Sequence, residues 1–414
     1  MRKNMAKSRH PGLLRSAAVA LATLLEFSAC ASARGYAFAM IVPDIRQPAS
    51  ASGGSACPVP SRQASGAGNI ALRWSTALGS SPATILTQST TATAQANEIE
   101  QTISTALSVW TGVAGTSLTP SALSPLTRIS SASACSSSDG IDSICFDQPD
   151  AGFTPGVLAF TRVVSADRVG EQLGAGAPST FPGQILDADL YFNPSDSNAT
   201  FATPAALAAN PKAYDLESIL THELGHFFGF SHSAVWGAMM FPYAHMTGTF
   251  ASPRPTAQAP DGPLGDDDRA GLRILYPAAT DDTYIGSISG RVLPANPLSL
   301  PASPPNVTGI FGAQVVALDA ATGTVAAATI AGWSCAAAGP ARFDGAYTLA
   351  KLAVGHSYSV YAEPLDGAVN PSQMWNAIGT LCRNATTDGN WPSAYACVVP
   401  SPDTQFTVGF RSSP

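Results

Sequence analysis

Hydrophobic and polar positions alternate in patterns that predict a mixed first part of the chain. Residues 69–75, 141–146, 156–164 and 184–193 read as strands, because apolar and polar side chains alternate in each. In the last of these, one face is expected to carry Leu186, Ala188, Leu190 and Phe192. Helical spacing of apolar residues predicts helices over 97–113 and 266–276, and a third from Tyr214 or Asp215 to Gly229. This part is therefore expected to be α+β, with a twisted mixed sheet and long helices.

The pattern changes after residue 282. Short alternating segments, separated by turn residues, predict strands at 284–292, 312–318, 323–330, 345–349 and 357–362. Residues 283–414 are therefore expected to form a small, separate all-β domain. At 414 residues the chain is long enough for two domains and a leader.

Composition narrows the class of protein and of partner. Charged residues make up 12% of the chain, which also holds 36 glycines and 33 prolines, so loops and strands are expected to dominate. The net charge is −7, and basic residues do not cluster beyond the first fifteen positions. A nucleic acid is therefore not expected as a partner. The protein is expected to be a monomer.

The first 39 residues read as an export signal. A basic start is followed by a short apolar core at 16–25 and then by small residues, with cleavage expected after Ala33 or Ala39. The core is too short to span a bilayer, and no later segment has eighteen apolar residues in a row. The segment 27–30 is similar to a bacterial lipoprotein box, so lipidation at Cys30 is the alternative to free secretion. Residues 40–68, rich in Pro, Ser, Ala and Gly, predict a linker or short pro-segment.

Six cysteines remain if Cys30 leaves with the signal, and an even number in an exported chain suggests disulfides. Cys135 and Cys145 flank a Ser/Asp/Gly loop and are the first expected pair, followed by Cys382 and Cys397. Six cysteines allow fifteen connectivities, so the rest stay open.

One stretch carries most of the candidate chemistry. Residues 221–232 read THELGHFFGFSH and hold three of the six histidines. His222 and His226 are four residues apart, so on a helix they can point two imidazoles at one metal ion. Gly229 can end the helix in a left-handed turn that returns His232 as a third ligand. Three imidazoles leave one zinc position open for water, which is the catalytic arrangement.

The reaction follows from the same stretch. Zinc lowers the pKa of a bound water to about 7, and Glu223 can take the proton of that water as general base without binding the metal. The bland alternative is a helix that carries histidines by chance, but the added glycine and third histidine make the motif specific.

The stretch resembles the zinc signature of the metzincins. Ser233 after the third histidine, Met240 eight residues past it, and the segment 264–276 resemble the matrixin branch. The resemblance implies a metzincin fold over 69–279 and a Met-turn at Met240, with Met239 as the competing candidate. It also implies a substrate pocket wall at Pro242 and substrate binding along the strand that holds Leu158 and Ala159.

Three departures from the animal matrixins matter. The other histidines do not lie in the strands that would hold a second zinc, so one catalytic ion is expected. Asp196 is placed for a calcium role, but Asn193 stands where an acid is expected, so calcium stays open. Cys57 lacks the surroundings of an inhibitory pro-segment cysteine, and a disulfide is the simpler expectation for it.

Residues 283–414 resemble the carboxypeptidase regulatory-like β-sandwich found on secreted bacterial enzymes; the segments 345–347 and 352–358 carry the likeness. The sequence thus predicts a secreted zinc endopeptidase acting on protein or peptide. Two alternatives remain: a surface binding or adhesion protein on a metalloprotease scaffold, and a zinc amidase acting on a non-protein amide. An intact Glu223 disfavours the first, and a deep closed pocket would favour the second.

Overall fold

The structure is a computed structural model of the chain. It describes residues 60–75, 83–129, 135, 138–148, 151–153, 156–166, 169–194, 199–230, 232–233, 235, 238–244, 246–249, 263–295, 308–310, 313–332 and 344–364, together with the backbone of 34–35 and 41–42. The expected signal peptide, Cys30, Cys57, Asp196 and the pair Cys382 and Cys397 lie outside the described residues. No helix of the described part is long and apolar enough to cross a membrane.

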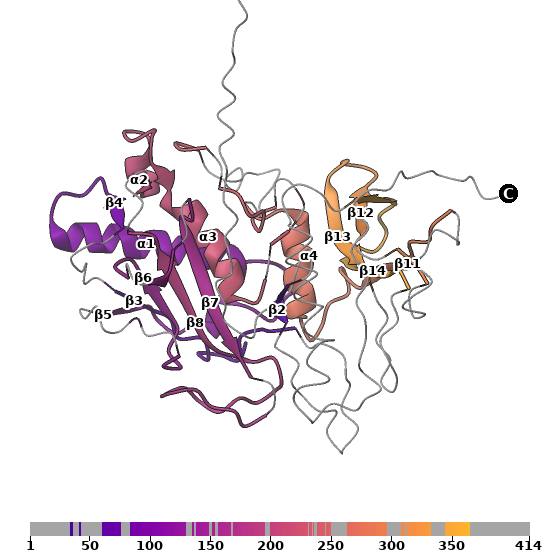
Figure 1. Cartoon of the computed structure of the whole chain (residues 1–414), viewed down its shortest axis with the longest axis horizontal. Coiled ribbons are helices and arrows are strands. Elements are labelled where there is room, and N and C mark those ends of the chain that lie inside the picture. Colours follow the sequence, from indigo (N-terminus) through magenta and orange to yellow (C-terminus); the bar gives the residue numbers. More distant parts are fainter. Residues whose placement is uncertain are drawn as a thin grey trace, which may run out of the picture.

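A five-stranded mixed sheet forms the centre of the first part (Figure 1). Its order is β5 (Thr127–Ile129), β3 (Arg73–Ser75), β6 (Ser143–Cys145), β8 (Ile185–Phe192) and β7 (Ala159–Ser165). The strands β5, β3, β6 and β8 run parallel to one another. The strand β7 is antiparallel to β8 and forms one edge of the sheet. This is the mixed sheet expected from the sequence.

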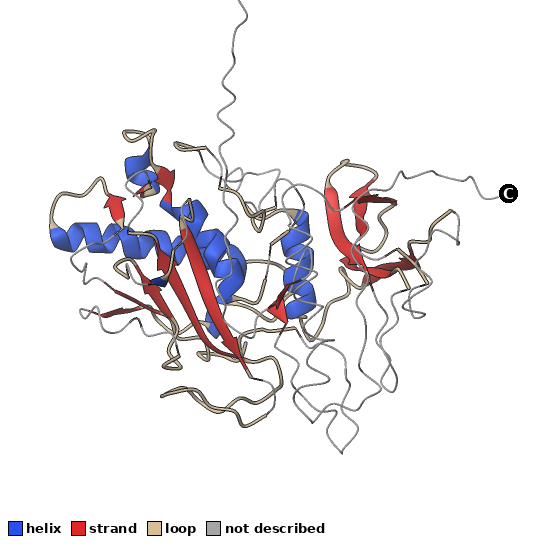
Figure 2. Ribbon diagram, viewed as in Figure 1, coloured by secondary structure: helices blue, strands red, loops and turns tan. Residues whose placement is uncertain are grey.

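Two long helices pack together against this sheet. They are α1 (Ala92–Thr111) and α3 (Leu216–Phe227), and α3 contacts β7 and β8 (Figure 2). The side chain of Thr91 caps α1, and that of Asp215 caps α3 by accepting from the Glu217 N–H, as expected of an N-cap. Trp110 of α1 is fully buried, and its indole N–H donates to the Thr221 carbonyl at 2.8 Å. This contact fixes α1 beside the helix that carries the histidines.

Smaller elements complete this part. A three-stranded sheet has the order β10 (Tyr214–Asp215), β9 (Thr200–Ala202) and β4 (Thr84–Leu86), next to the short helix α2 (Pro204–Leu207). A 3-10 turn covers Pro120–Ala122, and β1 (Arg34–Gly35) pairs with β2 (Ile41–Val42). A disulfide joins Cys135 to Cys145, which confirms the first expected pair.

The second part contains two small sheets. One pairs β11 (Gly286–Arg291) with β14 (Ala346–Leu352); the other has the order β13 (Val325–Ala331), β12 (Ala313–Asp319) and β15 (Tyr358–Pro364). These five strands lie where the sequence predicts strands, while a complete sandwich domain over 283–414 stays a prediction. The helix α4 (Asp266–Leu275) lies between the two parts (Figure 1).

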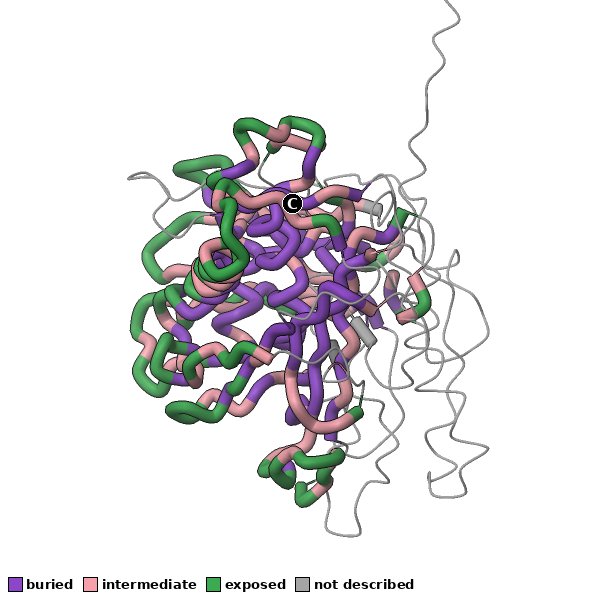
Figure 3. Tube along the Cα trace, turned by 90° about the vertical axis from the view of Figure 1, so that its left-hand side faces the viewer, coloured by how far each residue is buried: buried purple, intermediate pink, exposed green. Residues whose placement is uncertain are grey.

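Burial in two segments adds to what the sequence predicts. In β8, three residues of the expected apolar face, Ala188, Leu190 and Phe192, are buried, and Asp187, Asp189 and Tyr191 on the other face are buried as well. In addition, Ser61 and Gln63 are buried although they fall in the expected linker. The backbone N–H of Gln63 donates to the Tyr276 hydroxyl, and Arg62 pairs with the start of β8. The domain start at residue 69 stays a prediction, and residues 61–63 pack with the unit that follows. Figure 3 shows how the buried segments gather in its interior.

Candidate metal centre

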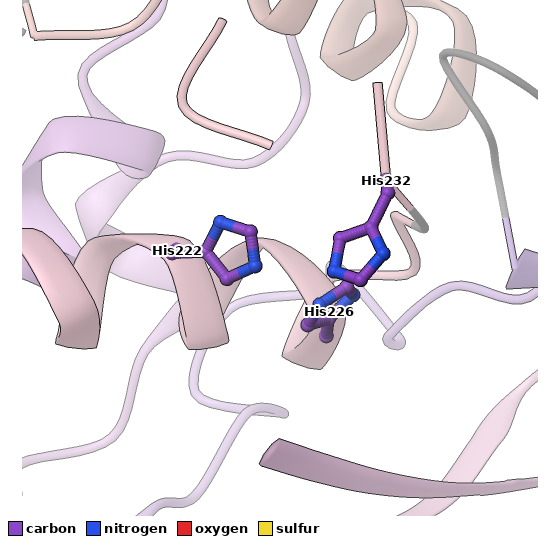
Figure 4. A group of neighbouring side chains, drawn as sticks. All are labelled: His222, His226 and His232. Carbon is purple, nitrogen blue, oxygen red and sulfur yellow. The ribbon is translucent and has the colours of Figure 1, made fainter. Parts of the chain in front are cut away.

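Three imidazoles converge at the end of α3 (Figure 4). His222 and His226 share one face of the helix, and the chain beyond Gly229 returns His232 to them. The ring centroids are 5.0 Å apart for His222 and His226, 5.3 Å for His222 and His232, and 4.9 Å for His226 and His232. One nitrogen from each ring lies within 4.8 Å of the other two, so a single ion can contact all three.

Backbone carbonyls orient two of these rings. The Nδ1 atom of His222 lies 2.7 Å from the Met239 carbonyl oxygen, and that of His226 lies 2.7 Å from the Phe230 carbonyl oxygen. Because a carbonyl only accepts, each Nδ1 carries the proton and each Nε2 keeps a free lone pair. His222 Nε2 is buried and has no hydrogen-bond partner among the described residues. This is the donor set that a zinc ion needs, so the residues present fit the metal.

Burial also keeps the three rings neutral. It lowers the pKa of His222 to about 4, and together with His222 it lowers the pKa of His226 to about 3. Burial, helped by the other two rings, likewise lowers the pKa of His232 well below its usual value. Only neutral imidazole can bind a metal, so the site is ready for an ion at neutral pH.

Glu223 directly follows His222 in α3 and is held by a residue of β7. Its side chain is 1% exposed, and its Oε2 atom accepts a hydrogen bond of 2.7 Å from the Thr161 hydroxyl. Burial raises the pKa of Glu223 to about 8, although the bond from Thr161 opposes this rise. A cation at the three histidines would favour the charged carboxylate, and so would lower that pKa.

Met240 lies beneath the helix. It is 1% exposed, and a Cβ atom added at Gly225 would come within 2.1 Å of its sulfur and 2.8 Å of the Trp110 ring. The glycine therefore lets Met240 pack directly against α3. Met239, the competing Met-turn candidate, instead contributes the carbonyl that orients His222. The two methionines thus make different contacts with the site.

Two acids at the start of α4 hold the loops that carry these groups. The Ser233 hydroxyl donates to Asp267 Oδ2 at 2.6 Å. Asp268 accepts the backbone N–H groups of Met239 and Met240 at 2.6 and 3.2 Å. The Ser233 N–H donates to the Met240 carbonyl at 2.8 Å. α4 therefore anchors both the chain after His232 and the turn that contains Met240.

The residues expected to line a substrate pocket are all among the described residues. Ala159 begins the edge strand β7 and is buried, and the preceding Leu158 is partly buried against the main core. Pro242 is buried two residues after Met240. Their contact with substrate stays a prediction.

Among the described residues, the only cluster of side chains arranged to hold a metal ion is the group of three histidines, so no set of calcium ligands is found there. Asn193 instead ties the start of β7 to the end of β8, because its side-chain N–H donates to the Val157 carbonyl at 2.7 Å. Asp187 and Asp189 are buried, and together with the half-buried Asp142 they form an acidic group whose charges repel one another. Burial raises the pKa of Asp142 to about 8 and that of Asp189 to about 9. Calcium at Asp196 stays a prediction.

Sequence reasoning missed three features of this site: the hydrogen bond of Thr161, the two orienting carbonyls and the anchoring role of Asp267 and Asp268. The carbonyls leave no trace in a sequence, because every residue has one. The sequence predicted a helix over 266–276 but no role for its two acids. Their spacing did carry a signal, since Asp268 also caps its own helix by accepting from the Gly265 N–H.

Three neutral imidazoles with a buried carboxylate beside them define a zinc hydrolase type of site. Comparison with protein families agrees with this class. The model of the matrixin family, peptidase M10, matches residues 161–277. The matched segment contains the three histidines, Glu223 and Met240, and it supports a zinc metallopeptidase catalytic domain.

Proposed function

We propose that the chain is a secreted zinc endopeptidase of the metzincin type, with one zinc held by His222, His226 and His232. The observation that carries the proposal is the juxtaposition of three neutral imidazoles with the buried carboxyl group of Glu223. Zinc bound there supplies a Lewis acid that polarises a carbonyl and acidifies water.

The remaining steps fall to side chains of this protein. Glu223 takes a proton from the attacking water as general base, and then passes it to the leaving amine as the C–N bond breaks. Thr161 holds the carboxylate in place through its hydroxyl. Met240 is the floor beneath the ligands, in keeping with its packing against Gly225.

The proposed substrate is an extended peptide. β7 is an edge strand that contacts α3, so its free edge can pair with a substrate main chain beside Glu223. Leu158 and Ala159 would lie along the peptide, and Pro242 would form the wall of the side-chain pocket. Such pairing requires consecutive peptide bonds, which favours proteins over small amides.

Export is part of the proposal. A disulfide between Cys135 and Cys145 persists in oxidising compartments, which supports secretion by the signal at 1–39. Free release is proposed over attachment through Cys30.

Cleavage of an unfolded protein tests the function. The purified protein with one zinc per chain should cut a denatured, labelled protein into peptides. A chelator should stop the reaction, and added zinc should restore it, because the reaction is proposed to need the zinc that the three histidines hold. Zinc binding with cleavage of small amides alone would favour an amidase. Zinc binding without hydrolysis of either substrate would favour a binding protein.

Thr161→Val should lower kcat about tenfold and leave KM and zinc content nearly unchanged. Valine keeps the shape of the side chain but removes a hydrogen bond to a charged group, which is worth about 1.5–3 kcal/mol. Thr161→Ser keeps the hydroxyl and should recover most of the activity. Steady-state kinetics on one peptide provide the measurement. Equal rates for the valine and serine variants would contradict a positioning role for this hydroxyl.

A further inference from the structure

The helix α4 belongs to two cores at once. Leu272, Leu275 and Tyr276 pack with the main core of the first part. Ala270, on the same helix, is fully buried in a second cluster with Val315, Ala327 and other residues of the C-terminal strands. The C-terminal β-region, defined here as β11 to β15, is thus packed against the helix that anchors the loops of the metal centre.

One hydrogen bond connects this region to Asp267. The backbone N–H of Ala328, in β13, donates to Asp267 Oδ1 at 2.9 Å, and both residues are buried. β13 is the outer strand of its sheet. An edge strand presents N–H groups that its own sheet does not use, and here one of them meets a carboxylate.

The other oxygen of the same carboxylate points toward the metal centre. Asp267 Oδ2 accepts from the hydroxyl of Ser233, the residue directly after His232. The Ser233 hydroxyl in turn accepts the Val235 N–H at 3.1 Å. A continuous path of hydrogen bonds therefore runs from the β13 backbone through one carboxylate to the loop that follows the third histidine.

We propose that the C-terminal β-region is a positioning element of the metal centre, acting through the Ala328 N–H, Asp267 and Ser233 on His232. This rests on the proposed zinc site and adds a role for the second part of the chain. His232 is the one ligand outside α3, so its position depends on the loop rather than on a helix. Without the Ala328 bond, the carboxylate can rotate and the loop gains freedom, which speeds the loss of the ion.

Ala328→Pro tests the link in the full chain. Proline removes the one N–H that Asp267 uses, and an edge strand tolerates proline where the N–H points away from its sheet. Mutation of a group that supports a metal ligand typically lowers metal affinity about 10–100-fold. Transfer of zinc from the variant to a chromogenic chelator should therefore become about tenfold faster. The readout is zinc release, and it needs no peptidase activity.

A matched control separates this effect from general damage to the strand. The N–H of Ile330 lies on the same edge by strand alternation, about 7 Å further along, so Ile330→Pro makes the same change away from Asp267. This variant should release zinc at nearly the wild-type rate. If both prolines speed release equally, or if neither does, the inference is overturned.

Ser233→Ala, which contains no proline, keeps the test decisive if the prolines prevent folding. Ser233→Ala removes the other end of the path and should also release zinc about tenfold faster. In the Ser233→Ala background Ala328→Pro should add little, because the path is already broken, whereas additive effects would contradict it. Wild-type protein that binds no zinc would overturn the proposed function. Zinc-binding wild type with an unaffected Ser233→Ala would overturn this inference alone.

Discussion

Glu223→Gln should lower kcat for peptide cleavage by about 10²–10⁴-fold, the usual contribution of a general base. Glutamine has nearly the same shape, and its carbonyl oxygen can still accept the bond from Thr161. It cannot take a proton from water. Zinc content should stay at one ion per chain, because Glu223 is not among the three proposed ligands. Kinetics and zinc analysis on the same preparation provide the measurement.

Glu217→Gln is the matched control. Glu217 is also buried in α3, in its first turn, and lies six residues before Glu223. The same chemical change there should leave most of the activity. If Glu223→Gln retains full activity, another group must be the base. If it loses its zinc, the carboxylate supports the metal rather than the proton transfer.

Gly229→Ala should destabilise the protein by about 3 kcal/mol or more and leave much of it without zinc. Gly229 has φ of +108°, a conformation that costs other residues about 1–3 kcal/mol. An added Cβ atom would also come within 2.1 Å of the Ser61 carbonyl oxygen, a backbone atom that cannot rotate away. Relief of this clash must displace either the segment at Ser61 or the turn toward His232.

Gly170→Ala separates the two causes. Gly170 has φ of +86°, but an added Cβ atom there would meet no atom within 4 Å. It should therefore show the conformational cost alone, about 1–3 kcal/mol. Denaturant unfolding of both variants gives the difference in free energy. If Gly229→Ala loses no more free energy of unfolding than Gly170→Ala, the close approach to Ser61 does not contribute to the destabilisation.

The cluster of three histidines proposed to bind the metal could be predicted from the sequence because its geometry is local. A helix fixes His222 and His226 on one face, and one glycine turn separates them from His232. The bond between Thr161 and Glu223 could not be predicted, because it depends on the packing of β7 against α3 across 62 positions. The link from Ala328 to Asp267 was hidden for the same reason, since a free backbone N–H leaves no signal in the residue type.

The long elements were predicted well, and several of the short ones were missed. Helix α1 and strands β7 and β8 are long enough for their periodicity to be read. β4, β5, β9 and β10 have only two or three residues, too few for any alternation to be recognised. The burial of Asp187 and Asp189 in β8 was not predicted, because acidic side chains are seldom fully buried.

The close contact between Ser61 and Gly229 limits how much of the N-terminal segment can be removed during maturation. Ser61 and Gln63 are buried, and the N–H of Gln63 meets a Tyr276 hydroxyl that itself donates to the Phe228 carbonyl, just before the turn. Trimming that removed these residues would take away a support of the segment between two of the proposed metal ligands. A processed form that keeps its activity should therefore begin before Ser61, so the stretch that precedes it sets the range for the mature N-terminus.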